Sequence, residues 1–193
     1  SPTHGQLHFL IRGGRRIGQR GSPVADLFRV LDVAYRPGRA DLHTWHSAEL
    51  VTDFAGVAAD LTTYNAAGWL GRFALANTLT DAETPRFYAA ICAGLGRFVG
   101  AAGQHTSRTE TLVCATIVGV VLVFLDEHGL LADAPTDTPQ QRRNLRALLT
   151  MGEGHAPPPD LPVAVWTRLA HWAERLLHHS DCRLPAPIPG PGA

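Results

Sequence analysis

The sequence predicts an α+β protein, with a small β-rich module at its amino end and a helical body after it. Three segments within the first 55 residues are rich in β-branched and aromatic residues and are bounded by Gly, Pro or Asp, which is typical of strands. From about Gly56 onward, alanine, leucine and arginine become frequent and the strand patterns fade. The predicted units are a β module at 1–55, a helical domain at 56–184 and a disordered, proline-rich tail at 185–193.

The predicted strands are residues 6–11, 27–35 and 41–51. The second and third are joined by the sequence RPGR, which is typical of a turn. The connection between the first and second, RGGRRIGQRGSP, carries four glycines and four arginines. We expect it to be an exposed loop.

The predicted helices are residues 57–79, 85–101, 109–128, 139–150 and 161–181. Asp81 and Thr84 are candidate caps, and Pro85 suits a first helical position. Gly129 is a candidate helix stop.

The longest apolar run, Leu112 to Leu125, has 14 residues. It is too short to span a bilayer and predicts a buried core helix. Because Arg12 interrupts the first apolar run, no signal peptide is predicted. Three widely spaced cysteines with no CxxC pattern predict neither a disulfide framework nor a zinc ribbon. We therefore expect a soluble cytoplasmic protein with no membrane contact.

The charges are divided unevenly along a chain whose formal net charge is zero. The first forty residues contain seven arginines and two acids, a balance of +5, and the remainder is acidic to the same extent. The chain has no lysine, so every fixed side-chain cation is a guanidinium, which binds phosphates through planar, bidentate contacts. This distribution predicts a module that binds nucleic acid, joined to a body that binds proteins.

Clustered arginines on a glycine-rich loop suit contacts with successive phosphates along the backbone of a nucleic acid. The alternative is that the loop is only a solvated hairpin loop with no ligand. The loop lacks the lysine of a phosphate-binding P-loop, so nucleotide hydrolysis is not expected. Nearby aromatic residues could stack on bases, but their alternation favours core positions; they are Phe9, Phe28, Tyr35 and Trp45.

Metal and catalytic sites receive little support from the sequence. His43 and His46 lie three apart on a predicted strand and therefore point to opposite faces. A stripe on the last predicted helix resembles a ligand set, but the opposite side, with Val165, Leu169, Trp172 and Leu176, is the expected core face. The stripe, His171, Glu174, His178 and Cys182, is then expected to face solvent. The sequence has no GxSxG or HExxH pattern and no closely spaced Cys–His pair on a candidate loop, and Cys114, inside the apolar run, predicts an inert buried thiol. We therefore expect no enzyme and no cofactor.

Two stretches of the β module resemble the amino-terminal module of the bacterial RecO family. They are HGQLHFLIRGGRR, from His4 to Arg16, and LFRVLDVAYRPGRADLHTWHSAELVTDF, from Leu27 to Phe54. The order and spacing of these pieces, over about 50 residues, carry the resemblance. It implies an OB-fold-like module followed by a helical domain.

The resemblance also implies a role in DNA repair and recombination without enzymatic activity. Such a protein binds single- and double-stranded DNA, anneals complementary strands and helps to load recombinase, with RecR and the carboxyl-terminal tail of single-strand-binding protein as partners. The resemblance begins partway through the family's five-stranded barrel, so its first two strands have no counterpart in the given residues; either the given sequence starts late or another segment covers that edge. The four zinc-finger cysteines that many relatives carry are absent from about 129–160.

Candidate DNA-binding residues follow from the resemblance and from local charge. Arg12, Arg15 and Arg16 match the family's basic loop, and Arg20, Arg36 and Arg39 are added because they lie close in sequence. A partner tail that is acidic with an apolar tip would require an apolar notch with arginines at its rim. The candidates are Arg142, Arg143, Arg146 and Arg168. The alternative function is a helical adaptor whose basic module binds an acidic protein.

Overall fold

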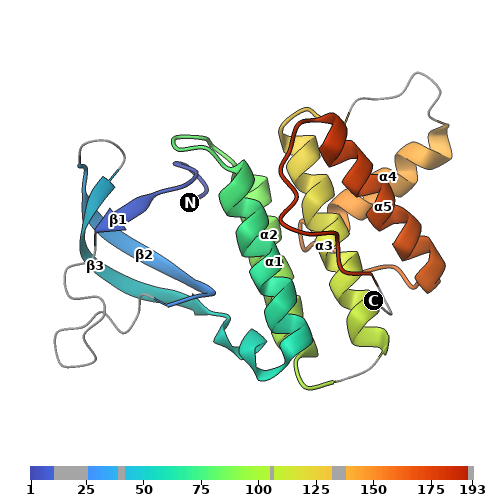
Figure 1. Cartoon of the computed structure of the whole chain (residues 1–193), viewed down its shortest axis with the longest axis horizontal. Helices are drawn as coiled ribbons and strands as arrows, with labels where there is room; N and C mark the ends of the chain where they lie inside the picture. Colours follow the sequence, from blue (N-terminus) through green and yellow to red (C-terminus); the bar gives the residue numbers. More distant parts are fainter. Residues whose placement is uncertain (11–25, 39–41, 105–106, 132–137, 191–193) are drawn as a thin grey trace.

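The computed structural model describes residues 1–10, 26–38, 42–104, 107–131 and 138–190. Its α+β architecture confirms the predicted class: a three-stranded sheet precedes a set of packed helices (Figure 1). The strands are β1 (His8–Leu10), β2 (Arg29–Arg36) and β3 (Leu42–Asp53), close to the three predicted segments. Each begins one or two residues after its predicted start.

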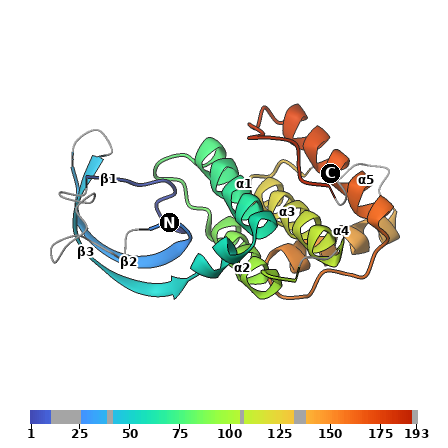
Figure 2. The ribbon, with the colours of Figure 1, turned by 60° about the horizontal axis from the view of Figure 1, so that its bottom comes forward.

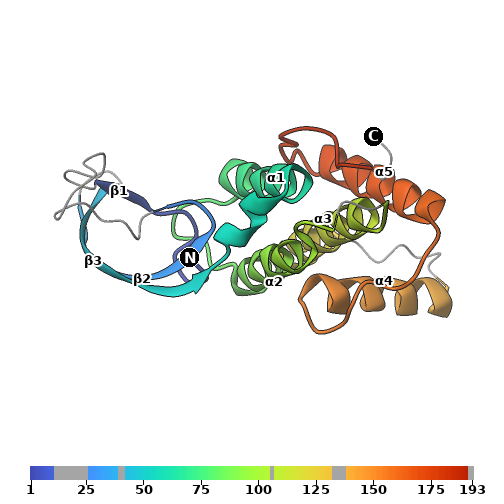
Figure 3. The ribbon, with the colours of Figure 1, turned by 90° about the horizontal axis from the view of Figure 1, so that it is seen from below.

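The sheet is mixed, with the order β1-β3-β2. β1 runs parallel to β3, and β2 runs antiparallel to it. Two register shifts, at Val30/Leu31 and Ala34/Tyr35, interrupt the β2–β3 pairing. Such bulges increase local twist and bending. In Figures 2 and 3 the sheet curves into an arc whose open side faces the helices.

The helical body contains a short 3₁₀ helix, η1 (Ala55–Ala59), and five longer helices: α1 (Leu61–Asn77), α2 (Pro85–Ala101), α3 (Ser107–Glu127), α4 (Pro139–Gly152) and α5 (Val163–His179). All five predicted helices are therefore present. The first is divided because Asp60 is extended, and its carboxylate accepts hydrogen bonds from the backbone N–H groups of Thr62 and Thr63. This is an N-cap, and it starts α1 four residues after the predicted position.

The core lies among the helices, and α3 is its centre. Every residue of α3 from Val113 to Leu125 is buried, so the apolar run forms the predicted core helix. In length and hydropathy α3 would also suit a membrane span, but 78% of its most apolar window is buried inside the protein. Gly129, with φ of 67°, ends this helix, and the N–H of Leu130 donates to the carbonyl of Leu125.

The start of α2 is capped from another helix. Pro85 occupies the first turn as predicted, but the candidate cap Thr84 makes no side-chain cap bond. Instead, the Glu127 carboxylate accepts from the backbone N–H groups of Arg86 (2.9 Å) and Phe87 (2.8 Å). The second candidate cap, Asp81, lies in a turn with φ of 59°. An acid from the end of α3 thus satisfies donors that the local sequence leaves open.

The segment predicted to be a disordered tail is ordered as far as residue 190. Ile188 is only 5% exposed, and its backbone N–H donates to the Glu174 carboxylate (2.6 Å). The Trp69 indole donates to the carbonyl of Ala186 (3.0 Å). The expectation of disorder was wrong for 185–190 because these contacts supply partners that proline-rich composition does not reveal; residues 191–193 lie outside the described chain.

The core face of α5 lies next to the one predicted. Its buried residues are Trp166, Ala170, Ala173 and Leu177. The four residues assigned to that face from the sequence, Val165, Leu169, Trp172 and Leu176, are half-buried beside it. Two alanines allow a close approach to α3, which a search for large side chains overlooks.

The centre of α3 contains a buried hydroxyl with no hydrogen-bond partner among the described residues, that of Thr116. Thr116→Val is expected to raise the free energy of unfolding by about 1 kcal/mol, because a buried unsatisfied polar group is removed. Chemical denaturation measures the change. The control is Thr63→Val, which is expected to destabilise, since that hydroxyl donates to the carbonyls of Val57 (2.8 Å) and Asp60 (3.1 Å). Loss of stability in the Thr116 variant would contradict the assignment.

Candidate nucleic-acid interface

Most of the predicted DNA-binding arginines lie outside the described residues; these are Arg12, Arg15, Arg16, Arg20 and Arg39. Arg36 is described. It is exposed, it ends β2, and it forms no ion pair with another described residue. Its guanidinium is therefore free of carboxylates within the part of the chain that the structure describes.

Arg29 has a different environment from Arg36, although both belong to the basic amino-terminal stretch. Its guanidinium is half-buried and lies 3.4 Å from the Asp53 carboxylate and 4.0 Å from that of Asp26. The pKa of Asp53 is held below its usual value, first by the hydrogen bond from the Ala55 backbone N–H and then by Arg29. Arg29 therefore joins the start of β2 to the end of β3, where the two strands are paired, and contributes little free positive charge.

The sheet register places two described residues that border the arginine-bearing connections, Leu10 and Arg36, in one row. Leu10, the last residue before the glycine- and arginine-rich stretch, is aligned with Thr44 on one side of β3. Arg36, which begins the RPGR turn, is aligned with Thr44 on the other side. Since neighbouring strands lie about 4.8 Å apart, Leu10 and Arg36 are separated by roughly 10 Å across the sheet.

Four rings form an aromatic cluster beside this row: Phe9, Tyr35, His43 and Trp45. The centroid of Phe9 lies 5.4 Å from that of Tyr35 and 5.5 Å from that of Trp45, both edge to face. All four residues are half-buried, and none belongs to the helical core. The prediction of core positions therefore holds only in part, because the rings cover one another instead of joining the main core.

The fourth predicted aromatic residue, Phe28, is placed differently. It packs against the helical core and meets Tyr64 edge to face, with centroids 5.9 Å apart. Its backbone carbonyl also accepts from the N–H of Phe54 (2.9 Å). Phe28 thus attaches the sheet to the helices and is not available for stacking on a base.

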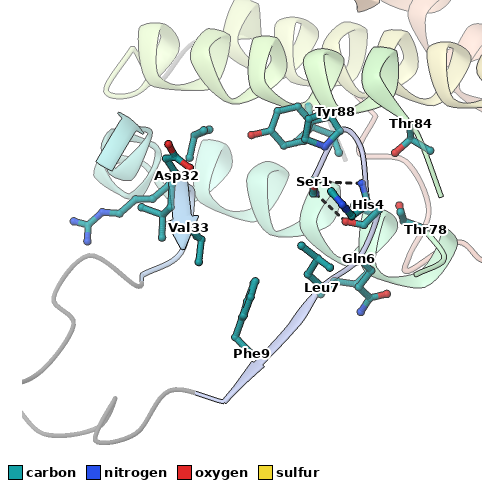
Figure 4. Close-up of a pocket in the computed structure, with 18 of the residues that line it drawn as sticks. Ser1, His4, Gln6, Leu7, Phe9, Asp32, Val33, Thr78, Thr84 and Tyr88 are labelled. Atoms are coloured by element: carbon teal, nitrogen blue, oxygen red, sulfur yellow. Dashed lines mark hydrogen bonds between the residues drawn. The ribbon is translucent and has the colours of Figure 1, made fainter. Parts of the chain in front are cut away.

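A cavity of about 580 Å³ lies between the sheet and the helices α1 and α2 (Figure 4). We call it the edge cavity. Leu7 and Phe9 line it from the β1 side, Val33 from β2, and Tyr88 from α2. On the β1 side the chain is fixed to the α1–α2 connection, where Gly5 pairs with Thr80. Gly5 has φ of 58°, and a Cβ there would lie 2.9 Å from the carbonyl oxygen of Ala82, so only glycine suits this position.

The predicted metal candidates do not converge. His43 belongs to the aromatic cluster while His46 is exposed, as expected for opposite faces of a strand. His171 and His178 are exposed on α5, as expected, while Glu174 binds the backbone of Ile188. No three His, Cys, Asp or Glu side chains among the described residues are placed to share a metal ion.

Cys114 is fully buried in α3, and burial raises the pKa of its thiol to about 11. The thiol is therefore protonated at neutral pH and a poor nucleophile, as its place in the apolar run predicts.

The four arginines proposed for a protein partner are exposed, three on α4 and Arg168 on α5. None of them lines the second cavity, which has a volume of about 980 Å³. Among the described residues its lining includes the apolar side chains of Leu112, Ala115 and Trp166, one arginine, Arg108, and one acid, Asp160. The helical body thus contains a notch with apolar side chains and an arginine. The sequence did not reveal the role of Arg108 because the wall opposite it is formed by 157–163, which lies far away along the chain.

No protein-family model, curated protein or solved structure matches this chain. The candidate interface therefore depends on its geometry and its charges.

Proposed function

We propose that this protein is a non-enzymatic, DNA-binding recombination mediator of the RecO type. It would bind single- and double-stranded DNA, anneal complementary strands and help to load recombinase together with RecR. The observation that carries the proposal is the alignment of Leu10 and Arg36 with the same residue of β3, Thr44. The two segments that contain the candidate arginines thus begin in one row of the sheet, beside a half-exposed aromatic cluster.

The topology supports the same proposal. A sheet with one parallel and one antiparallel pair around a central strand is consistent with three strands of a five-stranded OB barrel. Its strong curvature is also consistent with part of a barrel wall (Figure 3).

Annealing follows from electrostatics without a chemical step. Guanidinium groups that contact phosphates fix a strand on the surface but do not read its bases. Two complementary strands held on one cationic surface repel each other less, while their base edges remain free to pair. Arg36, exposed and without a carboxylate among the described residues, is suited to this role.

Replacing Arg15 and Arg16 together with alanine is expected to weaken DNA binding about tenfold or more, to the same extent for all sequences. If about four to six phosphates are neutralised, a plot of the logarithm of the DNA-binding constant against the logarithm of the salt concentration has a slope of roughly −3 to −5 for the native protein. For the double variant we expect the slope to be smaller in magnitude by about 2. Fluorescence anisotropy with labelled oligonucleotides at several salt concentrations measures both quantities.

The matched control removes two other adjacent arginines, Arg142 and Arg143, which are exposed on α4. This variant is expected to bind DNA normally. A salt slope near zero in the native protein, or equal losses in both double variants, would exclude the amino-terminal arginines. If an acidic protein displaced the oligonucleotide at moderate salt while excess DNA did not displace that protein, the adaptor function would be favoured.

The second cavity supports a place for the tail of single-strand-binding protein. A peptide with an apolar tip suits the apolar side chains of this cavity, and its acids would pair with Arg108 and lie away from Asp160, which also lines it. Arg108→Glu is expected to weaken binding of a labelled tail peptide about tenfold, whereas replacing Arg142 and Arg143 with alanine leaves it within about twofold. Anisotropy titration measures the difference. If the Arg142 and Arg143 variant lost more binding than the Arg108 variant, the tail would instead bind at α4.

A further inference from the structure

The edge cavity is not confined to one face of the sheet. Side chains of a strand alternate between its faces, so a pocket on one face is lined by every second residue. Here five consecutive residues of β2, Arg29 to Val33, line the cavity. The four consecutive residues that precede β1, His4 to Leu7, also line the cavity. Alternate residues of one sheet face, among them Phe9, Tyr35 and Trp45, line it as well. The cavity therefore covers part of that face and extends past it to the outer edges of β2 and of the segment before β1.

Both edges are open within the described part of the chain. β3 is the central strand, and each outer strand pairs with it on one side only. β2 is the longer outer strand, with eight residues, and its second edge pairs with no other strand among the described residues. The helices α1 and α2 complete the cavity with Ala74, Leu75, Tyr88 and Ile91.

We propose that the edge cavity is a peptide-binding site, in which an extended segment of a partner protein pairs with the free edge of β2. Alternate apolar side chains of that segment would enter the cavity against Leu31 and Val33, and its backbone would continue the sheet. This is a function of the β module beyond DNA binding.

Charge defines the partner further. Arg29 is paired with Asp53 and Asp26, so its charge is largely neutralised. Asp32 is exposed at the same edge and makes no ion pair with another described residue. The segment that fits best is therefore one with alternating apolar residues and a basic residue opposite Asp32.

A nucleic acid and a second copy of this chain suit the cavity less well. A strand edge offers alternating donors and acceptors that match a peptide backbone, and the Asp32 carboxylate repels phosphates. A second copy would have to insert one of its own strands, but its long free edge, β2, faces its own edge cavity. A volume of about 580 Å³ accepts one extended segment and not another sheet.

The probe is a fluorescein-labelled peptide of about eight residues, the length of β2, in which valine alternates with threonine and one central threonine is replaced by lysine. We expect binding to the full chain with Kd of roughly 10–100 μM by anisotropy. Two further peptides carry N-methyl groups on the valine or on the threonine nitrogens. Because N–H groups of alternate residues point to the same edge, one of the two is expected to lose binding and the other to retain it.

Two pairs of variants separate this site from non-specific adsorption. Leu75→Trp fills the cavity from α1 and is expected to weaken binding about tenfold, whereas Leu79→Trp, at a more exposed position outside the cavity lining, is expected to leave it within about twofold. Asp32→Lys is expected to reverse the preference between the lysine peptide and its glutamate counterpart, by about threefold in each direction.

Three results would overturn the proposal. They are no peptide binding up to about 1 mM, equal binding of the parent and both methylated peptides, and displacement of the peptide by an oligothymidine whose own binding is weakened by Leu75→Trp. The last result would assign the cavity to nucleic acid. Since these outcomes do not depend on Arg15 and Arg16, failure here is distinguishable from failure of the proposed DNA binding.

Discussion

Replacing Gly152 with alanine is expected to lower the free energy of unfolding by about 3 kcal/mol or more. Gly152 ends α4, where this helix crosses α3 at Gly119. A Cβ at Gly152 would lie 2.7 Å from the carbonyl carbon of Gly119 and 2.8 Å from a methyl group of Val123. The first neighbour is backbone inside the central helix, so it cannot move aside as a side chain can, and the two helices must separate.

Chemical denaturation monitored by circular dichroism measures this change. The control is Gly71→Ala in α1, where an added Cβ meets nothing within 4 Å. That variant is expected to be more stable than the native protein by about 0.5–1 kcal/mol, because alanine favours helix more than glycine does. If the two variants showed the same stability, the α3–α4 contact would not be as close as the structure describes.

Replacing Arg97 with alanine is expected to lower the free energy of unfolding by about 2–3 kcal/mol. The Arg97 guanidinium, in α2, donates to the backbone carbonyls of Met151 and Ala156, the latter at 3.1 Å. It makes no ion pair with another described residue, and burial lowers its pKa below the usual value. Its role is to satisfy carbonyl groups at the end of α4, where a cation also interacts favourably with the helix dipole.

The measurement is again the free energy of unfolding, now compared with Arg72→Ala, which removes an exposed arginine from α1. We expect that control to change stability by less than about 0.5 kcal/mol. Arg97→Lys should recover only part of the loss, because one ammonium group replaces a planar fork of donors. Full recovery by lysine would show that charge alone matters and that the paired carbonyl contacts do not.

Much of the helical body could be predicted because its signals are local. Pro85 and Gly129 mark helix boundaries through their own backbone preferences, and the apolar run from Leu112 to Leu125, with 14 residues, favoured a buried core helix. Errors appeared where a partner came from elsewhere in the chain. Thr84 was the plausible local cap of α2, but Glu127 satisfies its donors, and Ile188 is ordered by contacts with α5.

The candidate interface was predictable in composition but not in arrangement. The excess of arginine near the amino end is a property of the sequence, whereas the neutralisation of Arg29 by Asp53 requires the β2–β3 register. The aromatic cluster likewise depends on register, since Phe9 and Tyr35 come from strands on opposite sides of β3. In the sequence, the alternating spacing of the aromatic residues was the one indication of this cluster.

The sequence by itself determined the α+β class, the presence and approximate place of the five main described helices and the identity of the central core helix, because helical periodicity acts over one or two turns of chain. Within the described residues, only the tertiary structure decided which strand edges lack a partner strand, that a cavity lies beside them, and that Arg29 is paired with acids while Arg36 is not. Those properties depend on strand order, register and helix packing, which bring together residues far apart in the chain.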